Sequence, residues 1–121
     1  MSYNLLIVDD KELTRRNLTI FFEQCGHSVF QADTGEAALE LMTRVTFDTV
    51  ISDLRLPGSV NGLDVLKHYA KIRPGSGLIL MTAFGSAEVR SEAAKLGASY
   101  YEKPISLNEI LARIETFPPT V

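Results

Sequence analysis

Apolar and polar positions follow two alternating patterns along the chain. Short, almost continuous apolar runs, several of them rich in β-branched residues, predict strands at Leu5–Val8, His27–Ala32, Thr49–Asp53, Leu78–Thr82 and Ser99–Tyr101. Because several of these runs are apolar at consecutive positions, we expect a sheet that is covered on both faces, as parallel sheets are.

Segments with a helical period separate these strands. A capping-box pattern at Ser106 and Glu109 marks the start of the last one, and Gly26, Pro74-Gly75 and Gly97 mark helix ends. Apolar residues three, four or seven positions apart form the expected buried stripes: Leu18, Phe21, Phe22 and Cys25; Ala38, Leu41, Met42 and Val45; Val65, Tyr69 and Ile72; Val89, Ala93 and Leu96; Leu107, Ile110, Leu111 and Ile114.

The order of these elements predicts five βα units in a single domain over residues 1–121, with 116–121 either a tail or the start of a linker. Right-handed crossovers place helices on both faces of a parallel sheet and favour an open doubly wound fold. A closed barrel would need more units. In an open sheet the functional crevice lies beyond the carboxyl ends of the strands.

Composition and charge exclude several classes of protein. With 45% hydrophobic and 22% charged residues in 121, the chain is typical of a globular domain. A net charge of −3 gives no electrostatic footprint for direct nucleic-acid binding. No apolar run is long enough to span a membrane, and no signal segment precedes Leu5. The single cysteine, Cys25, fits a reducing compartment and is expected to be a small buried residue, so we expect a cytoplasmic protein.

Charged and hydroxyl side chains stand where the predicted strands end: Asp9 and Asp10, Asp53, Thr82 and Lys103. Two carboxylates about 4 Å apart repel by on the order of 4 kcal/mol at an effective dielectric of about 20, so a bound cation or a shared proton is expected among them. Carboxylate oxygens suit a hard divalent ion such as Mg²⁺. A lysine can bind a phosphoryl group, a hydroxyl can donate to one of its oxygens, and a strand-end carboxylate can be the nucleophile that accepts it.

In this order, the motifs Leu-Ile-Val-Asp9-Asp10, Asp53-Leu-Arg-Leu-Pro57-Gly58, Met-Thr82-Ala83 and Lys103-Pro104 resemble those of response-regulator receiver domains. These CheY-like modules of two-component signalling are phosphoproteins that act in phosphorelays. The resemblance covers Leu5 to about Phe117. It implies a flavodoxin-like, doubly wound (βα)5 sandwich with a five-stranded parallel sheet in the order 2-1-3-4-5.

The resemblance also implies a partner and a cofactor. Asp53 would accept a phosphoryl group from a sensor histidine kinase or a phosphotransfer protein and become a 4-aspartylphosphate. Asp10, Asp53 and the backbone carbonyl of Arg55 would bind Mg²⁺, or another divalent ion such as Mn²⁺, directly, and Asp9 would act through a water. Such a domain catalyses only its own phosphorylation and dephosphorylation and is otherwise not an enzyme.

A second group of residues would detect the phosphoryl group. By the same resemblance, Thr82 would sense it, Lys103 would pair with it, and the Lys103–Pro104 bond would be cis. Counting back from Lys103 selects Tyr100 as the switch aromatic, whereas counting forward from Thr82 selects Tyr101. We favour Tyr100 because strand alternation from Lys103 fixes which way the side chains face.

The output surface would be the one formed by the fourth and fifth helices and the fifth strand. It would contact a downstream effector or a missing output domain. Receivers of this family often form homodimers when active, a point that the sequence leaves open. No membrane partner is expected.

Two segments depart from the family pattern, and some residues have simpler interpretations. The loop Gly58–Asn61 is one residue longer than usual, and the segment from Ala98 to Lys103 is one shorter. Asp10 is also a good N-cap for the first helix. The basic group Lys11, Arg15 and Arg16 is either a docking patch for the kinase or a solvated helix face, and His27 and His68 are expected to be structural or solvent-facing.

Three alternative functions fit the sequence less well. A Mg²⁺-dependent phosphohydrolase of the haloacid-dehalogenase kind also uses an aspartyl nucleophile, but it needs acids two positions apart after the first strand, where this chain has Asp9, Asp10 and then Lys11. A flavodoxin-like FMN binder needs a Ser-, Thr- and Gly-rich loop there. A degenerate receiver, which binds its partner without phosphorylation, would lack part of the set of strand-end residues.

Overall fold

Strands and helices alternate strictly in residues 2–118, the part of the chain that the computed structural model describes. The elements are β1 Asn4–Val8, α1 Glu12–Gln24, β2 Ser28–Ala32, α2 Gly35–Met42, β3 Thr49–Asp53, α3 Gly62–Ile72, β4 Gly77–Thr82, α4 Ala87–Leu96, β5 Ser99–Glu102 and α5 Leu107–Ile114. The predicted strands and helices are all present, with ends shifted by a residue or two. The predicted tail at 116–121 falls partly on residues outside the described range.

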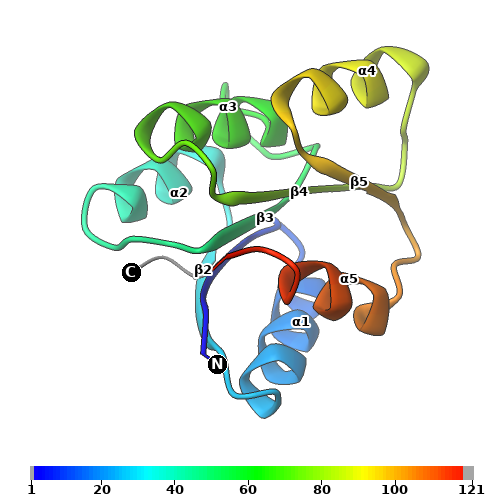
Figure 1. Ribbon diagram of the computed structural model, residues 1–121. Coiled ribbons are helices and arrows are strands. Elements are labelled where there is room, and N and C mark those ends of the chain that lie inside the picture. Colours follow the sequence, from blue (N-terminus) through cyan, green and yellow to red (C-terminus); the bar gives the residue numbers. More distant parts are fainter. Residues whose placement is uncertain (1, 119–121) are drawn as a thin grey trace.

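The strands form one parallel sheet in the order β2-β1-β3-β4-β5, which confirms the predicted topology. Helices α1 and α5 cover one face of this sheet, and α2, α3 and α4 cover the other (Figure 1). The chain crosses from one face to the other between β1 and β3, so the crevice beyond the carboxyl ends of these two strands is the place where a site is expected.

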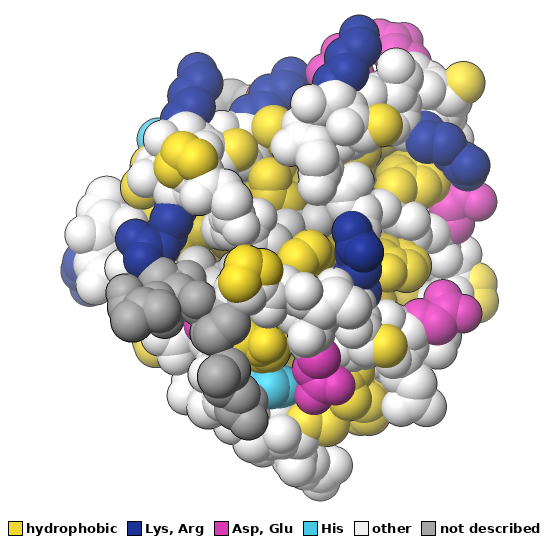
Figure 2. Space-filling view, viewed as in Figure 1, with side chains coloured by type: hydrophobic (Ala, Val, Ile, Leu, Met, Phe, Trp, Pro, Cys, Tyr) yellow, Lys and Arg dark blue, Asp and Glu magenta, His cyan; other side chains and the backbone are white. Residues whose placement is uncertain are grey.

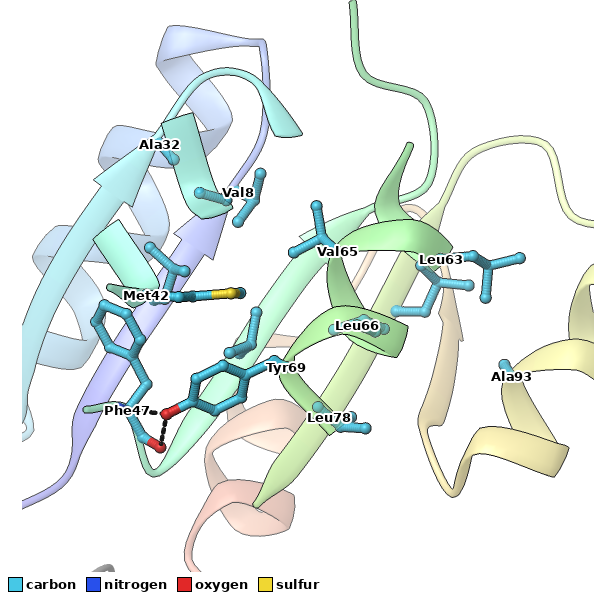
Figure 3. Close-up of a cluster of buried hydrophobic side chains, with 14 residues drawn as sticks. Val8, Ala32, Met42, Phe47, Leu63, Val65, Leu66, Tyr69, Leu78 and Ala93 are labelled. Atoms are coloured by element: carbon cyan, nitrogen blue, oxygen red, sulfur yellow. Dashed lines mark hydrogen bonds between the residues drawn. The ribbon is translucent and has the colours of Figure 1, made fainter. Parts of the chain in front are cut away.

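Two hydrophobic cores flank the sheet because successive strand residues point to opposite faces. In β1, Leu6 and Val8 belong to the core under α2, α3 and α4, whereas Leu5 and Ile7 belong to the core under α1 and α5. Every residue of β3 is buried, as the continuous apolar run predicts. The first of these cores is drawn in Figure 3.

A buried tyrosine closes this first core at the start of β3. The hydroxyl of Tyr69 in α3 accepts a hydrogen bond from the backbone N–H of Phe47 at 2.7 Å and donates one to the carbonyl of Phe47 at 2.8 Å (Figure 3). Burial raises the pKa of Tyr69 and keeps the hydroxyl neutral. The strand that ends at Asp53 is therefore fixed at its other end by two hydrogen bonds.

The helix ends follow the sequence signals with some exceptions. Gly26, Gly75 and Gly97 have positive φ angles, as their positions at helix ends predict. At α5, the side chain of Ser106 accepts a hydrogen bond from the backbone N–H of Glu109, which is one half of the predicted capping box. A complete box, with both reciprocal bonds, is found at α3, where Asn61 and Asp64 cap each other.

Two interpretations at α1 were wrong. Asp10 is not the N-cap, because α1 begins one residue later and its N-cap is Lys11, whose backbone N–H donates to the side chain of Asp9 at 2.9 Å. Cys25 is exposed rather than buried, because α1 ends at Gln24 and Cys25 is its C-cap, where the helical stripe no longer faces the core. No helix of the described range is long and apolar enough to cross a bilayer.

Surface charge does not gather into one basic field on the face seen in Figure 2. Lys and Arg side chains are distributed over this face, with hydrophobic and acidic side chains between them. His68 is exposed, and His27 is buried where its Nδ1 accepts a hydrogen bond from the backbone N–H of Tyr3 at 3.1 Å. Both histidines therefore have the structural or solvent-facing roles that we expected.

Candidate functional site

Three carboxylates meet beyond the carboxyl ends of β1 and β3. Oxygens from Asp9, Asp10 and Asp53 all lie within 4.8 Å of one another. Asp9 follows β1 and is fully buried, Asp53 is the last residue of β3 and only 3% exposed, and Asp10 is on the solvent side. The topology thus brings these three predicted residues together.

A lysine from the far end of the chain neutralises part of this charge. The Nζ atom of Lys103 lies 3.1 Å from Asp9 Oδ2 and 3.2 Å from Asp53 Oδ2. The backbone N–H of Lys103 donates to the carbonyl of Thr82 at 2.8 Å, which holds the segment after β5 against the end of β4. The Lys103–Pro104 peptide bond is cis, the isomer that the resemblance implies.

The protonation equilibria follow from burial and these contacts. Burial raises the pKa of Asp53, attraction to Lys103 opposes this, and the negative charge of Asp9 adds to it, so that the pKa is above its ordinary value. Burial acts to lower the pKa of Lys103, but the charges of Asp9 and Asp53 outweigh it and raise the pKa. Lys103 is therefore held as a cation.

The donor set suits a hard divalent cation. Three carboxylates outnumber the two lysines beside them, Lys103 and Lys11, so an excess of negative charge remains. Carboxylate oxygens are ligands that such ions prefer. Asp10, with 40% of its side chain exposed, lies on the side from which an ion can enter. Arg55 stands two residues beyond Asp53, and its guanidinium carbon lies 4.6 Å from the centre of the Phe84 ring, a cation–π contact.

Thr82 ends β4 beside the carboxylates. The residue is 1% exposed, and its Oγ1 accepts a hydrogen bond from the backbone N–H of Phe84 at 3.0 Å. Thr82 and Asp53 line the same small pocket, together with Lys11, Arg55, Ala83 and Phe84. The hydroxyl proton of Thr82 is not used in that bond, so it can donate to a group bound in the pocket.

The two candidate switch tyrosines face opposite sides of the sheet. Tyr100 is paired with Leu80 and packs against the core under α2, α3 and α4, whereas Tyr101 packs against the core under α1 and α5. Thr82 is two residues beyond Leu80 and so shares the face of Tyr100. The hydroxyl of Tyr100 donates to Glu102 Oε2 at 3.3 Å, and the guanidinium carbon of Arg90 lies 4.9 Å from its ring centre.

Several contacts of the site were not predicted from the sequence. The Nζ atom of Lys11 lies 3.8 Å from Asp10 Oδ1 and 3.9 Å from Asp53 Oδ2. Arg15 donates to the backbone carbonyl of Asp9 at 2.8 Å and to Gln31 at 3.1 Å, so it links the end of β1 to β2. A lysine directly after the acidic pair was the only signal for the first contact.

The longer loop after β3 contacts the first residues of α2. The backbone N–H and the hydroxyl of Ser59 both donate to Glu36 Oε2 at 3.4 Å. Val60 lies so close to Gly35 that a Cβ atom at Gly35 would be 2.5 Å from the Val60 carbonyl oxygen. The additional residue in Gly58–Asn61 is therefore accommodated at the start of α2.

Comparisons with known proteins agree with this fold. The family model of the response regulator receiver domain matches residues 5–115. Sporulation initiation phosphotransferase F of Bacillus subtilis is 33% identical over 120 residues, which cover 98% of this chain and 96% of that protein. The transcriptional regulatory protein CusR of Escherichia coli is 36% identical over 93% of this chain, which spans only 49% of that protein.

Solved structures show the same fold. A CheY-like receiver domain protein from Methanospirillum hungatei has a TM-score of 0.88 and 27% identity, and the match covers 96% of this chain and 93% of that one. A response regulator protein from Burkholderia pseudomallei, solved with a phosphorylated aspartic acid, a calcium ion and citrate, has a TM-score of 0.85 and 30% identity, over 93% of this chain and 66% of that one.

The fold and the carboxylate–lysine site define a signalling domain of the CheY-like, flavodoxin-like class. The chain belongs to the response regulator receiver domain family, and it acts in two-component signalling. Membership of this family implies a kinase or phosphotransfer partner. Neither the fold nor the comparisons support the phosphohydrolase alternative.

Proposed function

We propose that this receiver domain is a switch that is turned on by phosphorylation of Asp53. The observation that carries the proposal is the environment of this carboxylate, which is buried at the end of β3 with Lys103 Nζ at 3.2 Å and two further carboxylates beside it. Burying an acid beside two other carboxylates lowers the stability of the folded state, which points to a chemical role for Asp53. A phosphorylated aspartic acid in the Burkholderia relative supports the same assignment.

The transfer exchanges one bond for another. An oxygen of ionised Asp53 attacks the phosphorus of a phosphohistidine on the partner, an O–P bond forms and the N–P bond breaks. The imidazole of the partner keeps the electron pair and takes up a proton. Lys103, held as a cation by Asp9 and Asp53, pairs with the phosphoryl oxygens, and its compact charge offsets the charge that they bring.

Mg²⁺, or another divalent ion such as Mn²⁺, is the proposed cofactor. Asp10 and Asp53 and the backbone carbonyl of Arg55 would hold it directly, and Asp9 would hold it through a water. When bound, the ion supplies Lewis-acid stabilisation of the charge on the phosphoryl oxygens. The three clustered carboxylates, and the calcium ion in the Burkholderia relative, support this assignment.

The switch begins at Thr82 and ends on the surface of α4, β5 and α5. The Thr82 hydroxyl donates to a phosphoryl oxygen on Asp53, and its movement leaves room for Tyr100, which lies on the same face of the sheet. Tyr100 then gives up its contacts with Arg90 and Glu102 and turns inward. Phosphorylation shifts this equilibrium only by the difference in its interaction with the two states.

The altered surface is recognised by a downstream effector or by an attached output domain. The only catalysis in this scheme is the phosphorylation and dephosphorylation of Asp53 itself. The cytoplasm is the compartment that suits it, because a sensor kinase and its phosphoryl donor are found there.

A mass measurement tests the proposal. The protein is incubated with Mg²⁺ and phosphoramidate, and the intact mass is recorded before and after mild base. We expect one base-labile phosphoryl group in the wild type and none in Asp53→Asn or in the presence of EDTA. Asp64→Asn, which changes an exposed acid of the α3 cap, is the matched control and should be phosphorylated like the wild type. An unmodified wild type, or an adduct that persists in Asp53→Asn, refutes the proposal.

A further inference from the structure

The side chain of Lys11 folds back over the acidic cluster from the solvent side. Its Nζ atom is 3.8 Å from Asp10 Oδ1 and 3.9 Å from Asp53 Oδ2, while its backbone N–H donates to Asp9 Oδ1 at 2.9 Å. Lys11 therefore contacts each of the three carboxylates, through its main chain or its side chain. The short backbone bond fixes where the side chain starts.

The two lysines at the site differ in how firmly they are held. Lys103 has only 17% of its side chain exposed and makes two close contacts of 3.1 and 3.2 Å. Lys11 has 65% of its side chain exposed, and its two contacts are longer. A long contact made by an exposed ammonium group is weak, and the group exchanges easily with solvent or with another cation. Lys103 is thus a permanent member of the site, and Lys11 is a replaceable one.

We propose that Lys11 is a tethered counter-cation, which occupies the solvent side of the cluster in the metal-free protein and lowers its affinity for divalent cations. The inference rests on the proposed function, in which Asp10 and Asp53 hold Mg²⁺ directly. These are the two side chains whose oxygens Lys11 contacts, so its ammonium group and the metal ion compete for the same oxygens. Lys11 leaves this position when Mg²⁺ is bound.

Competition from Lys11 should weaken Mg²⁺ binding by a modest factor. Removing the ammonium group frees both carboxylates and removes the repulsion between like charges. From the usual strength of exposed ion pairs, we expect Mg²⁺ to bind about threefold to tenfold more tightly without it. The difference should shrink at high ionic strength, because salt screens exposed charges.

Lys11→Met, which keeps an unbranched side chain but no charge, tests the inference by titration of the whole chain with Mg²⁺. The dissociation constant is measured by calorimetry and by the shifts of backbone amide resonances near Asp10. We expect a constant three to ten times smaller than that of the wild type. Lys11→Arg should bind like the wild type, and so should Lys67→Met, which removes a lysine paired with Glu92 between α3 and α4.

Thermal unfolding gives a second readout that needs no phosphoryl donor. In EDTA, Lys11→Met should have a lower melting temperature than the wild type, because the carboxylates have lost a counter-charge. When Mg²⁺ is added, its melting temperature should rise by more than that of the wild type. Equal or weaker Mg²⁺ binding by Lys11→Met overturns the inference while the proposed function stands. A wild type that binds no Mg²⁺ overturns both.

Discussion

Tyr69→Phe removes one oxygen atom and leaves two buried backbone groups without partners. The hydroxyl of Tyr69 satisfies both the N–H and the carbonyl of Phe47, and the two residues are 1% and 0% exposed. Phenylalanine fills the same space, so no large cavity forms and the cost is that of the lost hydrogen bonds.

The expected loss of stability is large for so small a change. An unsatisfied buried donor or acceptor costs about 1–3 kcal/mol, so two of them cost about 2–6 kcal/mol. Domains of this size have a free energy of unfolding of only about 5–15 kcal/mol. At about 4 °C per kcal/mol, the melting temperature should fall by roughly 8–24 °C.

Urea unfolding followed by circular dichroism measures this loss. Tyr3→Phe is the graded control, because Tyr3 donates only one hydrogen bond, to the carbonyl of Phe117 at 3.1 Å, and should lose about 0.5–1.5 kcal/mol. Phosphorylation of folded Tyr69→Phe at low temperature should match the wild type, since Asp53 is at the opposite end of β3 from Phe47. The reasoning fails if Tyr69→Phe loses no more stability than Tyr3→Phe.

Two further changes test the electrostatics and the packing of the site. Asp53→Asn should raise the free energy of unfolding at neutral pH, because burial raises the pKa of Asp53 above its ordinary value of 3.8 and makes its ionised form costly. The free energy of unfolding of the wild type falls as the pH rises from 3.8 through the folded-state pKa, so the advantage of the variant should vanish in acid. Urea titrations across this pH window measure both proteins. A difference in free energy of unfolding that does not change with pH would contradict this prediction. Gly35→Ala should lower the free energy of unfolding by about 1–3 kcal/mol, since its Cβ atom would clash with Val60. Unchanged urea unfolding would contradict this, because it would mean that the loop moves aside without cost.

Much of the fold and most of the site could be predicted from the sequence, because periodicity and strand ends depend on local composition. The rule that parallel strands end at one edge was enough to bring Asp9, Asp53 and Lys103 together. Where a side chain lies at an element's boundary, the same local rules failed. Cys25 matches the stripe of α1 but follows its last residue, and Lys11 has a long side chain whose direction depends on charges from two other segments.

The shortened segment before Lys103 shows why counting residues is weaker evidence than strand register for the choice between Tyr100 and Tyr101. One residue fewer than usual makes the two counts disagree, whereas the strand register pairs Leu80 with Tyr100 and Thr82 with Glu102 and so supports our proposal of Tyr100. That register puts Tyr100 on the face of Thr82. The contacts that hold its ring there come from Arg90 and Glu102, whose side chains are 63% and 57% exposed. Because exposed contacts of this kind are weak, the inward turn that we propose for Tyr100 would cost little, and a small displacement of Thr82 would be enough to bias it.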